Sequence, residues 1–473
     1  MALKYDFTVA GTEVFETVNP ARPQEIVGRY SWTNEADIPE IVAKANRAQA
    51  EWAKVPGLER AAKLDAFLDA VLENIDRIAA AIVAEQGKIL PEAKGETMKG
   101  ATEGRFMVGE AARMGALSIA NGRADFANQI LRRPRGTIFC ISPWNFPAMT
   151  PLRKMCPALA FGNAVIFKPS QFTPAANYIL CEIAQAFFPD GLVQMAMIGG
   201  RQASEMIATQ NIQGVSFTGS VGTGRLVGKA AAENLIPAQL ELGGKNAAIL
   251  HDCDDLDHAV SQIYGAAFQT GGQRCTSISR VLIKRELFDD AKALFVAKAK
   301  AAVLGDGMKA DTTMGPLCNK GHFEDVVSTT AKALSEGAIA VAGGTAAEGA
   351  GDEGGYFFAP TILDNVSHES TAGQVEIFGP VLSLMPFDSF DEAMHTLNDT
   401  EFGLTSALFS NHNSLVQRFL AESQNGMMHV NHGTVPDNNM PFGGVKNSGV
   451  GAYSVGPTAV NFYTSEHAAY VAY

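Results

Sequence analysis

The stretch AVIFKPS, residues 164–170, decides the fold class of this chain of 473 residues. Its apolar run predicts a buried strand, and the apolar spacing over 151–161 and 174–187 predicts a helix on either side of it. The alternation continues downstream, with strands near 193–197 and 214–217 and a helix over 202–209. Because strands separated by helices of this length form parallel α/β units, we predict an α/β fold.

The same pattern extends in both directions along the chain. Upstream it predicts helices over 37–52 and 58–86 and a strand, a turn and a buried strand over 129–142. Downstream it predicts a helix after Gly222, strands over 239–242 and 281–283, a helix over 286–303 and glycine-rich turns at 343–355. These elements form two α/β units joined near residue 245. Since no low-complexity linker separates the units, we expect a broad interface between them.

Composition and charge limit the classes of function. The chain is longer than one hydrophobic core organises, so at least two packed units are expected. A net charge of −13 argues against nucleic acid as a partner. The six cysteines form no C-x-x-C pair, which disfavours a disulfide framework or a metal site. The N-terminus shows no secretion signal and no apolar run is long enough to cross a bilayer, so we expect a cytoplasmic protein without a membrane partner.

A cysteine among glycines is the strongest sign of chemistry. Cys275 lies in GGQRCT, residues 271–276, and Glu241 precedes it in LELGGK, residues 240–245. A free cysteine usually fills apolar space in a core. Glycine and polar neighbours are poor core material, however, so the pattern favours a thiol that a substrate can approach. A carboxylate delivered to that thiol could activate water, and the pair together indicates covalent catalysis.

Other motifs suggest a nucleotide and an oxyanion. VSFTGS, residues 215–220, is an apolar strand whose small terminal residues open a helix, where backbone N–H groups can hold a pyrophosphate. The spacing departs from G-x-G-x-x-G, so a simple tight turn is an equal alternative. Lys168 at a neighbouring strand end shifts the balance toward a nucleotide. In PWNFP, residues 143–147, two prolines fix a turn that could aim Asn145 at an oxyanion, although a turn asparagine often bonds its own backbone.

These motifs, in this order, resemble the NAD(P)-dependent aldehyde dehydrogenase superfamily from about residue 18 to the end. The resemblance also uses EIFGP, residues 376–380, and PFGG, residues 441–444. It implies a Rossmann-like cofactor domain, a catalytic domain and a small β oligomerisation element, which would make a homodimer or homotetramer. Their bounds would be 1–120 with 138–243 for the cofactor domain, 244–452 for the catalytic domain, and 121–137 with 453–473 for the oligomerisation element.

The resemblance also implies roles for individual residues. Cys275 would attack the aldehyde carbonyl, Asn145 would hold the oxyanion, and Glu241 would activate the water that hydrolyses the thioester. NAD or NADP would be held by a set of polar and aromatic side chains and glycine: Trp144, Lys168, Ser170, Gln171, Gly219, Ser220, Glu376 and Phe378. NAD-selective members often carry glutamate where this chain has Gln171. A neutral amide does not repel a 2′-phosphate, so we expect NADP to be tolerated and NAD not to be excluded.

The substrate end of the site is suggested by Arg153 in TPLRK, residues 150–154. The position is similar to that of an arginine in succinate-semialdehyde dehydrogenases, where it receives the substrate carboxylate. A second arginine of those enzymes is replaced here by Gln269, which predicts a weaker or differently shaped anion site. Thr434, His429 and His432 fall where the family's substrate-tunnel loop lies. We therefore expect a small-molecule substrate, a short aldehyde with a distal carboxylate or sulfonate.

Several alternatives stay open at this level. Arg153 could simply pair with an acid at a helix surface. The substrate could be a neutral aliphatic or aromatic aldehyde. A coenzyme A-acylating dehydrogenase uses the same thiol but lacks the water-activating acid, and Glu241 argues against it. A binding or structural protein that retains the fold would be expected to lose the thiol, the acid or the amide, and the sequence keeps all three.

Overall fold

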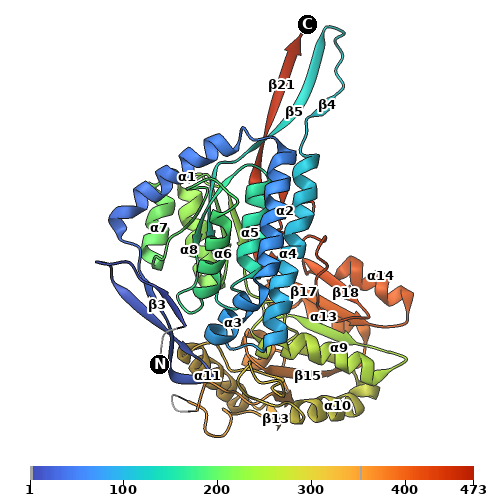
Figure 1. Cartoon of the computed structure of the whole chain (residues 1–473). Helices are drawn as coiled ribbons and strands as arrows, with labels where there is room; N and C mark the ends of the chain where they lie inside the picture. Colours follow the sequence, from blue (N-terminus) through green and yellow to red (C-terminus); the bar gives the residue numbers. More distant parts are fainter. Residues whose placement is uncertain (1–3, 352–353) are drawn as a thin grey trace.

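A computed structural model describes residues 4–351 and 354–473 and contains two large, mostly parallel β-sheets (Figure 1). The first sheet has the strand order β20-β10-β9-β6-β7-β8. Its strands are β6 Thr137–Ile141, β7 Ala164–Lys168, β8 Val193–Met195, β9 Gly214–Thr218, β10 Ala238–Glu241 and β20 Gly449–Val450. The strands from β6 to β10 pair in parallel, which confirms the α/β class predicted from residues 164–170.

Helices cover this first sheet, and α1 and α5 both contact β6 and β7. The helices of the unit are α1 Ile38–Trp52, α2 Gly57–Glu73, α3 Ile75–Gln86, α4 Leu90–Arg113, α5 Met149–Ala160, α6 Ala175–Gln185, α7 Gly200–Thr209 and α8 Val221–Glu233. The expected single helix over 58–86 is wrong, because the chain leaves helical geometry at Asn74 (φ −95°, ψ 13°) and forms α2 and α3. Helix α3 ends at Gly87, whose left-handed φ of 94° turns the chain toward α4.

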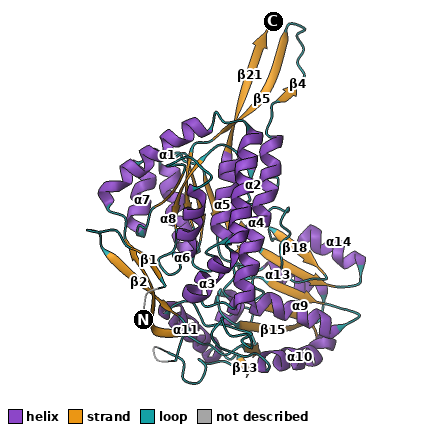
Figure 2. Ribbon diagram, viewed as in Figure 1, coloured by secondary structure: helices purple, strands orange, loops and turns teal. Residues whose placement is uncertain are grey.

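The second sheet has the order β13-β14-β15-β12-β11-β17-β18. Its strands are β11 Ala247–Leu250, β12 Arg280–Lys284, β13 Ile339–Ala342, β14 Thr361–Asp364, β15 Val381–Phe387, β17 Thr405–Phe409 and β18 Met427–Val430. Its main helices are α9 Leu256–Phe268, α10 Phe288–Lys300, α11 Lys320–Ser335, α13 Phe390–Asn398 and α14 Asn413–Glu422. Figure 2 shows helices surrounding the strands in both units.

Alternating side chains of β11 explain why the second sheet is covered on both faces. Ala248 and Leu250 belong to one hydrophobic cluster with residues of α9 and α10. Ala247 and Ile249 point the other way and pack with residues of α13 and α14. A strand with both faces buried reads as a continuous apolar run, which is what residues 247–250 show.

The two units exchange chain segments close to the predicted junction at residue 245. Strand β10 ends the first sheet at Glu241, and β11 begins the second sheet at Ala247. A late segment then returns, because β20 pairs antiparallel with β10 and places Gly449 opposite Glu241. The domain bounds stay a prediction, and β20, at the end of the range 244–452 predicted for the catalytic domain, pairs with the first sheet.

Two smaller sheets complete the fold. Strands β4 Leu117–Ile119, β5 Phe126–Pro134 and β21 Thr464–Ala472 form an arm that projects from the body near the C-terminus (Figure 1). Strands β1 Tyr5–Phe7, β2 Val14–Asn19 and β3 Arg22–Ser31 form an N-terminal sheet that the sequence did not predict. The short elements are β16 Phe402–Gly403, β19 Val445–Lys446, α12 Thr371–Gln374 and α15 Val460–Tyr463. In residues 4–351 and 354–473, no helix combines the length and apolarity needed to span a membrane.

Candidate active site

A cavity of about 600 Å³ joins the ends of elements from both units. It is lined by the 143–150 turn, by residues 218–220 after β9, by residues 241–243 after β10, and by the 274–276 segment. Cys275, Glu241 and Asn145 all line it, so the structure brings together the three residues predicted to do the chemistry. The volume falls in the range of typical small-molecule sites.

The turn before Cys275 requires glycine. A short 3-10 helix, Gln269–Gly272, contains left-handed backbone at Thr270, Gly271 and Gly272, with φ of 58°, 62° and 71°. A Cβ on Gly272 would also lie 2.1 Å from the carbonyl oxygen of Gly379, so no other residue fits. The tight turn presents the thiol of Cys275 to the cavity, where it is only partly exposed.

The thiol of Cys275 needs a proton acceptor before it can attack. Burial raises its pKa to about 12, and the positive charge of Arg153 opposes that rise. The neutral thiol therefore predominates at pH 7, whereas the thiolate is the nucleophile. A base in the same cavity must take the proton as the sulfur bonds to carbon.

Glu241 is a suitable base at the end of β10. Burial raises its pKa to about 8, against the lowering influence of Lys154 and Arg153. Its Oε2 has no hydrogen-bond partner among the described residues, so this oxygen is available to a water or a thiol. A carboxyl group with a pKa near the working pH can both accept and release a proton.

Gly243 fixes the approach of Glu376 to the end of β10. A Cβ on Gly243 would lie 2.1 Å from a carboxylate oxygen of Glu376, and the backbone N–H of Gly244 donates to that carboxylate at 2.9 Å. Burial raises the pKa of Glu376 to about 7. The lack of a side chain at Gly243 thus lets Glu376 approach the end of β10, where it lines the cavity.

The side chain of Asn145 reaches the loop that carries Cys275. Its Nδ2 donates to the backbone carbonyl of Gln273 at 3.0 Å. The local alternative, a turn asparagine that bonds its own turn, is not the arrangement found. One N–H of the carboxamide is engaged in this bond, and the other remains to donate to an oxygen in the cavity.

The predicted cofactor residues divide into two groups. Trp144, Gly219, Ser220, Glu376 and Phe378 line the cavity. Three others lie beyond it, Lys168 as the last residue of β7 and Ser170 and Gln171 just after it. Strand β7 neighbours β6 in the sheet. Gln171 is exposed, and Lys168 is half-buried with a pKa lowered by burial. Together these residues trace a path along the strand ends, the usual ligand position in an open α/β sheet.

The start of α8 fits a pyrophosphate. Ser220 caps the helix by accepting the N–H of Thr223, and a Cβ added to Gly222 would meet no atom within 4 Å. The first turn is therefore open to an anion that its backbone N–H groups could hold. NAD(P) bound along this path would supply the acceptor for a hydride.

The substrate end of the cavity differs from the sequence-based expectation. Arg153 and Gln269 line it as predicted, but Arg153 forms a two-point pair with Glu103, with N–O distances of 2.9 and 2.8 Å. Both side chains are buried, at 8% and 3% exposure. The alternative in which Arg153 pairs with an acid is therefore confirmed, although the pair is buried and not at a helix surface.

The predicted tunnel loop is present, but different residues of it face the cavity. Thr434 is fully buried and donates its hydroxyl to the carbonyl of Thr276, so it supports the loop. Val435 and Pro436 line the cavity in its place. His429 and His432 are not among the lining residues.

Arg274 and His322 are two of the lining residues that were not predicted from the sequence. Arg274 donates to Gln269 Oε1 and, at 3.1 Å, to Thr276 Oγ1. An amide and a hydroxyl carry no charge, so neither of these acceptors balances the charge of Arg274. His322 stands beside the rings of Trp144 and Phe378, and burial lowers its pKa to about 4, which keeps it neutral. The position of Arg274 directly before Cys275 was the one available signal.

The Aldehyde dehydrogenase family matches residues 7–468 of the chain. An alpha-ketoglutaric semialdehyde dehydrogenase from Bacillus subtilis is 35% identical over 96% of this chain and 93% of its own length. A 4-trimethylaminobutyraldehyde dehydrogenase from Rattus norvegicus is 34% identical over 96% and 92%. The crystal structure of a betaine aldehyde dehydrogenase from Staphylococcus aureus, in complex with NAD+, has a TM-score of 0.94 at 29% identity and covers 98% of this chain and 92% of that one. The chain therefore belongs to the aldehyde dehydrogenase family and is an NAD(P)-dependent aldehyde oxidoreductase of α/β fold.

Proposed function

We propose that this enzyme oxidises short aldehydes with a carboxylate or sulfonate at the distal end, of the semialdehyde type. In this reaction Cys275 adds to the carbonyl carbon, its proton passes to Glu241, and the oxyanion is held by Asn145 and the backbone N–H of Cys275. Loss of a hydride from carbon leaves a thioester on Cys275. Glu241 releases the first proton to solvent and then takes a proton from the water that attacks the thioester. The carboxylic acid leaves, and the freed thiolate takes this proton to restore the thiol.

The observation that carries the choice of substrate is the buried cation of Arg274. Burial lowers the pKa of this guanidinium, with only partial compensation from nearby negative charge. Arg153, by contrast, has a raised pKa because Glu103 outweighs the cost of burial. Since buried charges are normally paired, Arg274 is the cation in this cavity that a substrate anion would pair. Arg153 and Gln269 would shape the same wall, and Thr434 would support it.

The charge of the cavity argues against a cationic substrate. Three cations line it, Arg274, Arg153 and the half-buried Lys99, together with four carboxyl groups, Glu92, Glu96, Glu241 and Glu376. Glu96 is paired with Lys88, and burial raises the pKa of the other three carboxyl groups, so the cations are only partly balanced. A trimethylammonium aldehyde, as in the name of the rat relative, would meet like charges here. Alpha-ketoglutaric semialdehyde, as in the name of the Bacillus relative, carries a carboxylate of the matching sign.

Replacing Arg274 with methionine tests this proposal. We expect KM for succinic semialdehyde to rise on the order of 10- to 100-fold, because a charge-assisted hydrogen bond is lost. Butanal has the same four-carbon chain with a methyl group in place of the carboxylate. For butanal we expect KM to change by less than about threefold. Steady-state rates of cofactor reduction with both aldehydes measure the difference.

Arg105, an exposed arginine of α4 that pairs with Asp65 and Asp69, provides the control. Arg105→Met should leave both aldehydes unaffected. Equal losses on succinic semialdehyde and butanal in Arg274→Met would refute the anion site. They would not refute the assignment of the protein as an aldehyde dehydrogenase.

The identity of Gln171 leads to a prediction about the cofactor. Gln171→Glu should lower the ratio of kcat/KM for NADP over NAD by roughly 10-fold or more, since a carboxylate repels the 2′-phosphate and accepts from ribose hydroxyls. The neutral substitution Gln171→Ala should leave the ratio near that of the parent enzyme. Parallel titrations with NAD and NADP at one aldehyde concentration measure both ratios. If the ratio in Gln171→Glu were unchanged, the 2′-phosphate would not lie near residue 171.

We also propose that the arm of β4, β5 and β21 joins copies of this chain into a homodimer or homotetramer. The arm exposes large apolar side chains, Leu117, Ile119, Tyr470 and Val471, at 60%, 42%, 74% and 42%. Exposed apolar strands at a sheet edge are suited to pairing with another chain. A cytoplasmic location fits the six unpaired cysteines.

A further inference from the structure

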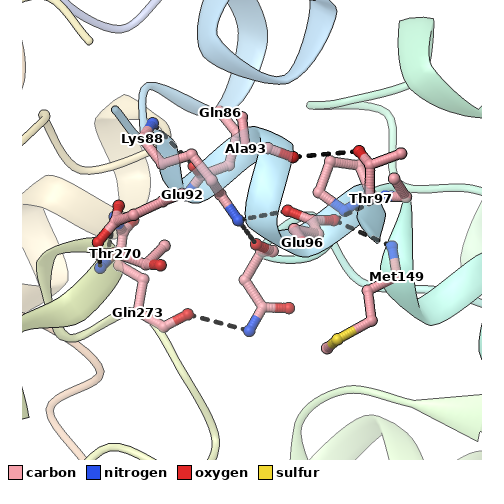
Figure 3. A network of polar contacts seen from close by, with 12 residues as sticks. Gln86, Lys88, Glu92, Ala93, Glu96, Thr97, Met149, Thr270 and Gln273 are labelled. Atoms are coloured by element: carbon pink, nitrogen blue, oxygen red, sulfur yellow. Dashed lines mark hydrogen bonds and ion pairs between the residues drawn. The ribbon is translucent and has the colours of Figure 1, made fainter. Parts of the chain in front are cut away.

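The buried ion pair of Lys88 and Glu96 (Figure 3) contacts the backbone of the turn that carries Asn145. Lys88 Nζ is 2.6 Å from Glu96 Oε2, and the two side chains are 0% and 1% exposed. Gly87 turns the chain into Lys88, whose backbone N–H is accepted by Gln86 Oε1 at 2.9 Å. Because burying two charges seldom adds net stability over apolar side chains, the pair calls for a reason other than stability.

The pair holds both sides of the turn that carries Asn145. Lys88 Nζ donates to the backbone carbonyl of Asn145 at 2.8 Å and lies 4.2 Å from the ring centre of Phe146. Glu96 Oε1 accepts the backbone N–H groups of Ala148 and Met149, at 2.7 and 3.1 Å, where α5 begins. Pro143 and Pro147 have no N–H, so this turn has few backbone bonds of its own. The ion pair supplies the missing contacts.

The side chain of Asn145 is fixed from the opposite direction. Its Nδ2 bonds the carbonyl of Gln273, two residues before Cys275. The amide of Gln273 is itself held, with Nε2 donating to Thr270 at 3.0 Å and Oε1 accepting the N–H of Cys318 at 2.9 Å. Figure 3 shows Lys88, Glu96, Thr270 and Gln273 within this network of polar contacts. Asn145 is thus held by one hydrogen bond to its backbone carbonyl and another from its carboxamide.

We propose that Lys88, oriented by Glu96, is a positioning residue that sets the place of the Asn145 carboxamide at the oxyanion. Stabilisation of an oxyanion depends on donors that are fixed before the reaction, and a shift of about 1 Å can cost on the order of 100-fold in rate. Lys88 does not line the cavity, so it acts through Asn145. The inference rests on the dehydrogenase activity and not on which aldehyde is used.

The test is a double-mutant cycle in the full-length enzyme. Lys88→Met keeps the apolar stem against Phe146 and removes the donor to Asn145. We expect kcat to fall on the order of 100-fold with KM changed by less than about threefold. In an Asn145→Ala background the same substitution should cost less than about twofold, because the group it positions is gone. Equal losses in the two backgrounds would overturn the proposal and assign Lys88 a general structural role.

Alkylation of Cys275 separates positioning from damage to the site. Iodoacetamide is attacked by sulfur at its methylene carbon, iodide leaves, and no oxyanion forms. In Lys88→Met we expect the alkylation rate, followed by mass spectrometry, to stay within about threefold of the parent. The measurement uses a Cys253→Ala background, because Cys253 is the other partly exposed thiol among the described cysteines. A loss of alkylation equal to the loss of kcat would contradict the proposal.

Two further variants keep the test decisive if Lys88→Met folds poorly. Glu96→Gln retains an acceptor for the start of α5 and removes the charge that orients Lys88, so a smaller loss of kcat is expected, again absent in Asn145→Ala. Lys94→Met is the matched control, since Lys94 is an exposed lysine of α4 paired with Asp76 at 2.6 Å. It should leave kcat unchanged. A loss in Glu96→Gln that persists in Asn145→Ala would also overturn the proposal.

Discussion

Replacing Cys275 with alanine should lower kcat/KM for aldehyde oxidation by at least about 10,000-fold. The thiol forms the covalent bond through which both the hydride transfer and the hydrolysis proceed, and no other thiol replaces it. Cys140, Cys156, Cys181 and Cys318 are buried. The expected result is a rate of cofactor reduction at the background level, with the protein still folded and still binding NAD or NADP.

Cys253 provides the control for this substitution. It is half-exposed, as Cys275 is, but it does not line the cavity. Cys253→Ala should retain the parent activity and the parent sensitivity to iodoacetamide. If Cys275→Ala kept more than about 1% of the parent activity, the covalent route through this thiol would be wrong.

Replacing Glu241 with glutamine should stop the cycle at the thioester. The amide cannot accept a proton from water, so hydrolysis should slow on the order of 100- to 10,000-fold. The first hydride transfer should slow less, because the thiol of Cys275 can still lose its proton to solvent before it attacks. Rapid mixing should then show a burst of about one reduced cofactor per active site, followed by a slow steady state. Intact-mass measurement of the quenched protein should find the acyl group on Cys275.

The pKa of Glu241 sets the pH dependence of the same step. Only the carboxylate accepts a proton, and burial raises its pKa to about 8. Hydrolysis should therefore rise with pH through about 8 and level off above it. In Glu241→Gln this rise should disappear. If the substitution left the steady-state rate unchanged, Glu241 would have no role in the mechanism. A separate experiment adds coenzyme A to the parent enzyme, and accumulation of an acyl-coenzyme A would favour the acylating alternative.

The fold was most predictable where the pattern is local. The strand predicted within residues 164–170 is found at Ala164–Lys168, because an uninterrupted apolar run suits a strand buried on both faces. The break at Asn74 was missed because apolar spacing continues through it from α2 to α3. The pairing of β20 with β10 could not be predicted from a two-residue strand, since tertiary contacts decide where such a short segment lies.

The residues of the candidate site also divide into those predictable from local motifs and those decided by tertiary contacts. Cys275, Glu241 and Asn145 were identified because each lies in a short motif of glycine or proline whose turn chemistry is local. The family resemblance then assigned their roles. Lys88 and Glu96 gave no such sign, because their effect depends on a turn that the chain reaches only at residues 143–149.

By itself, therefore, the sequence determined the α/β class, the family and the three groups that meet in the cavity, since these depend on patterns a few residues long. Only the tertiary structure decided which of the buried charges are paired within the protein. Arg153 is matched by Glu103, fifty positions earlier in the chain, whereas Arg274 bonds neutral Gln269 and Thr276. The charge that a buried group offers to a ligand depends on the partners that packing brings to it, and no local pattern records those partners.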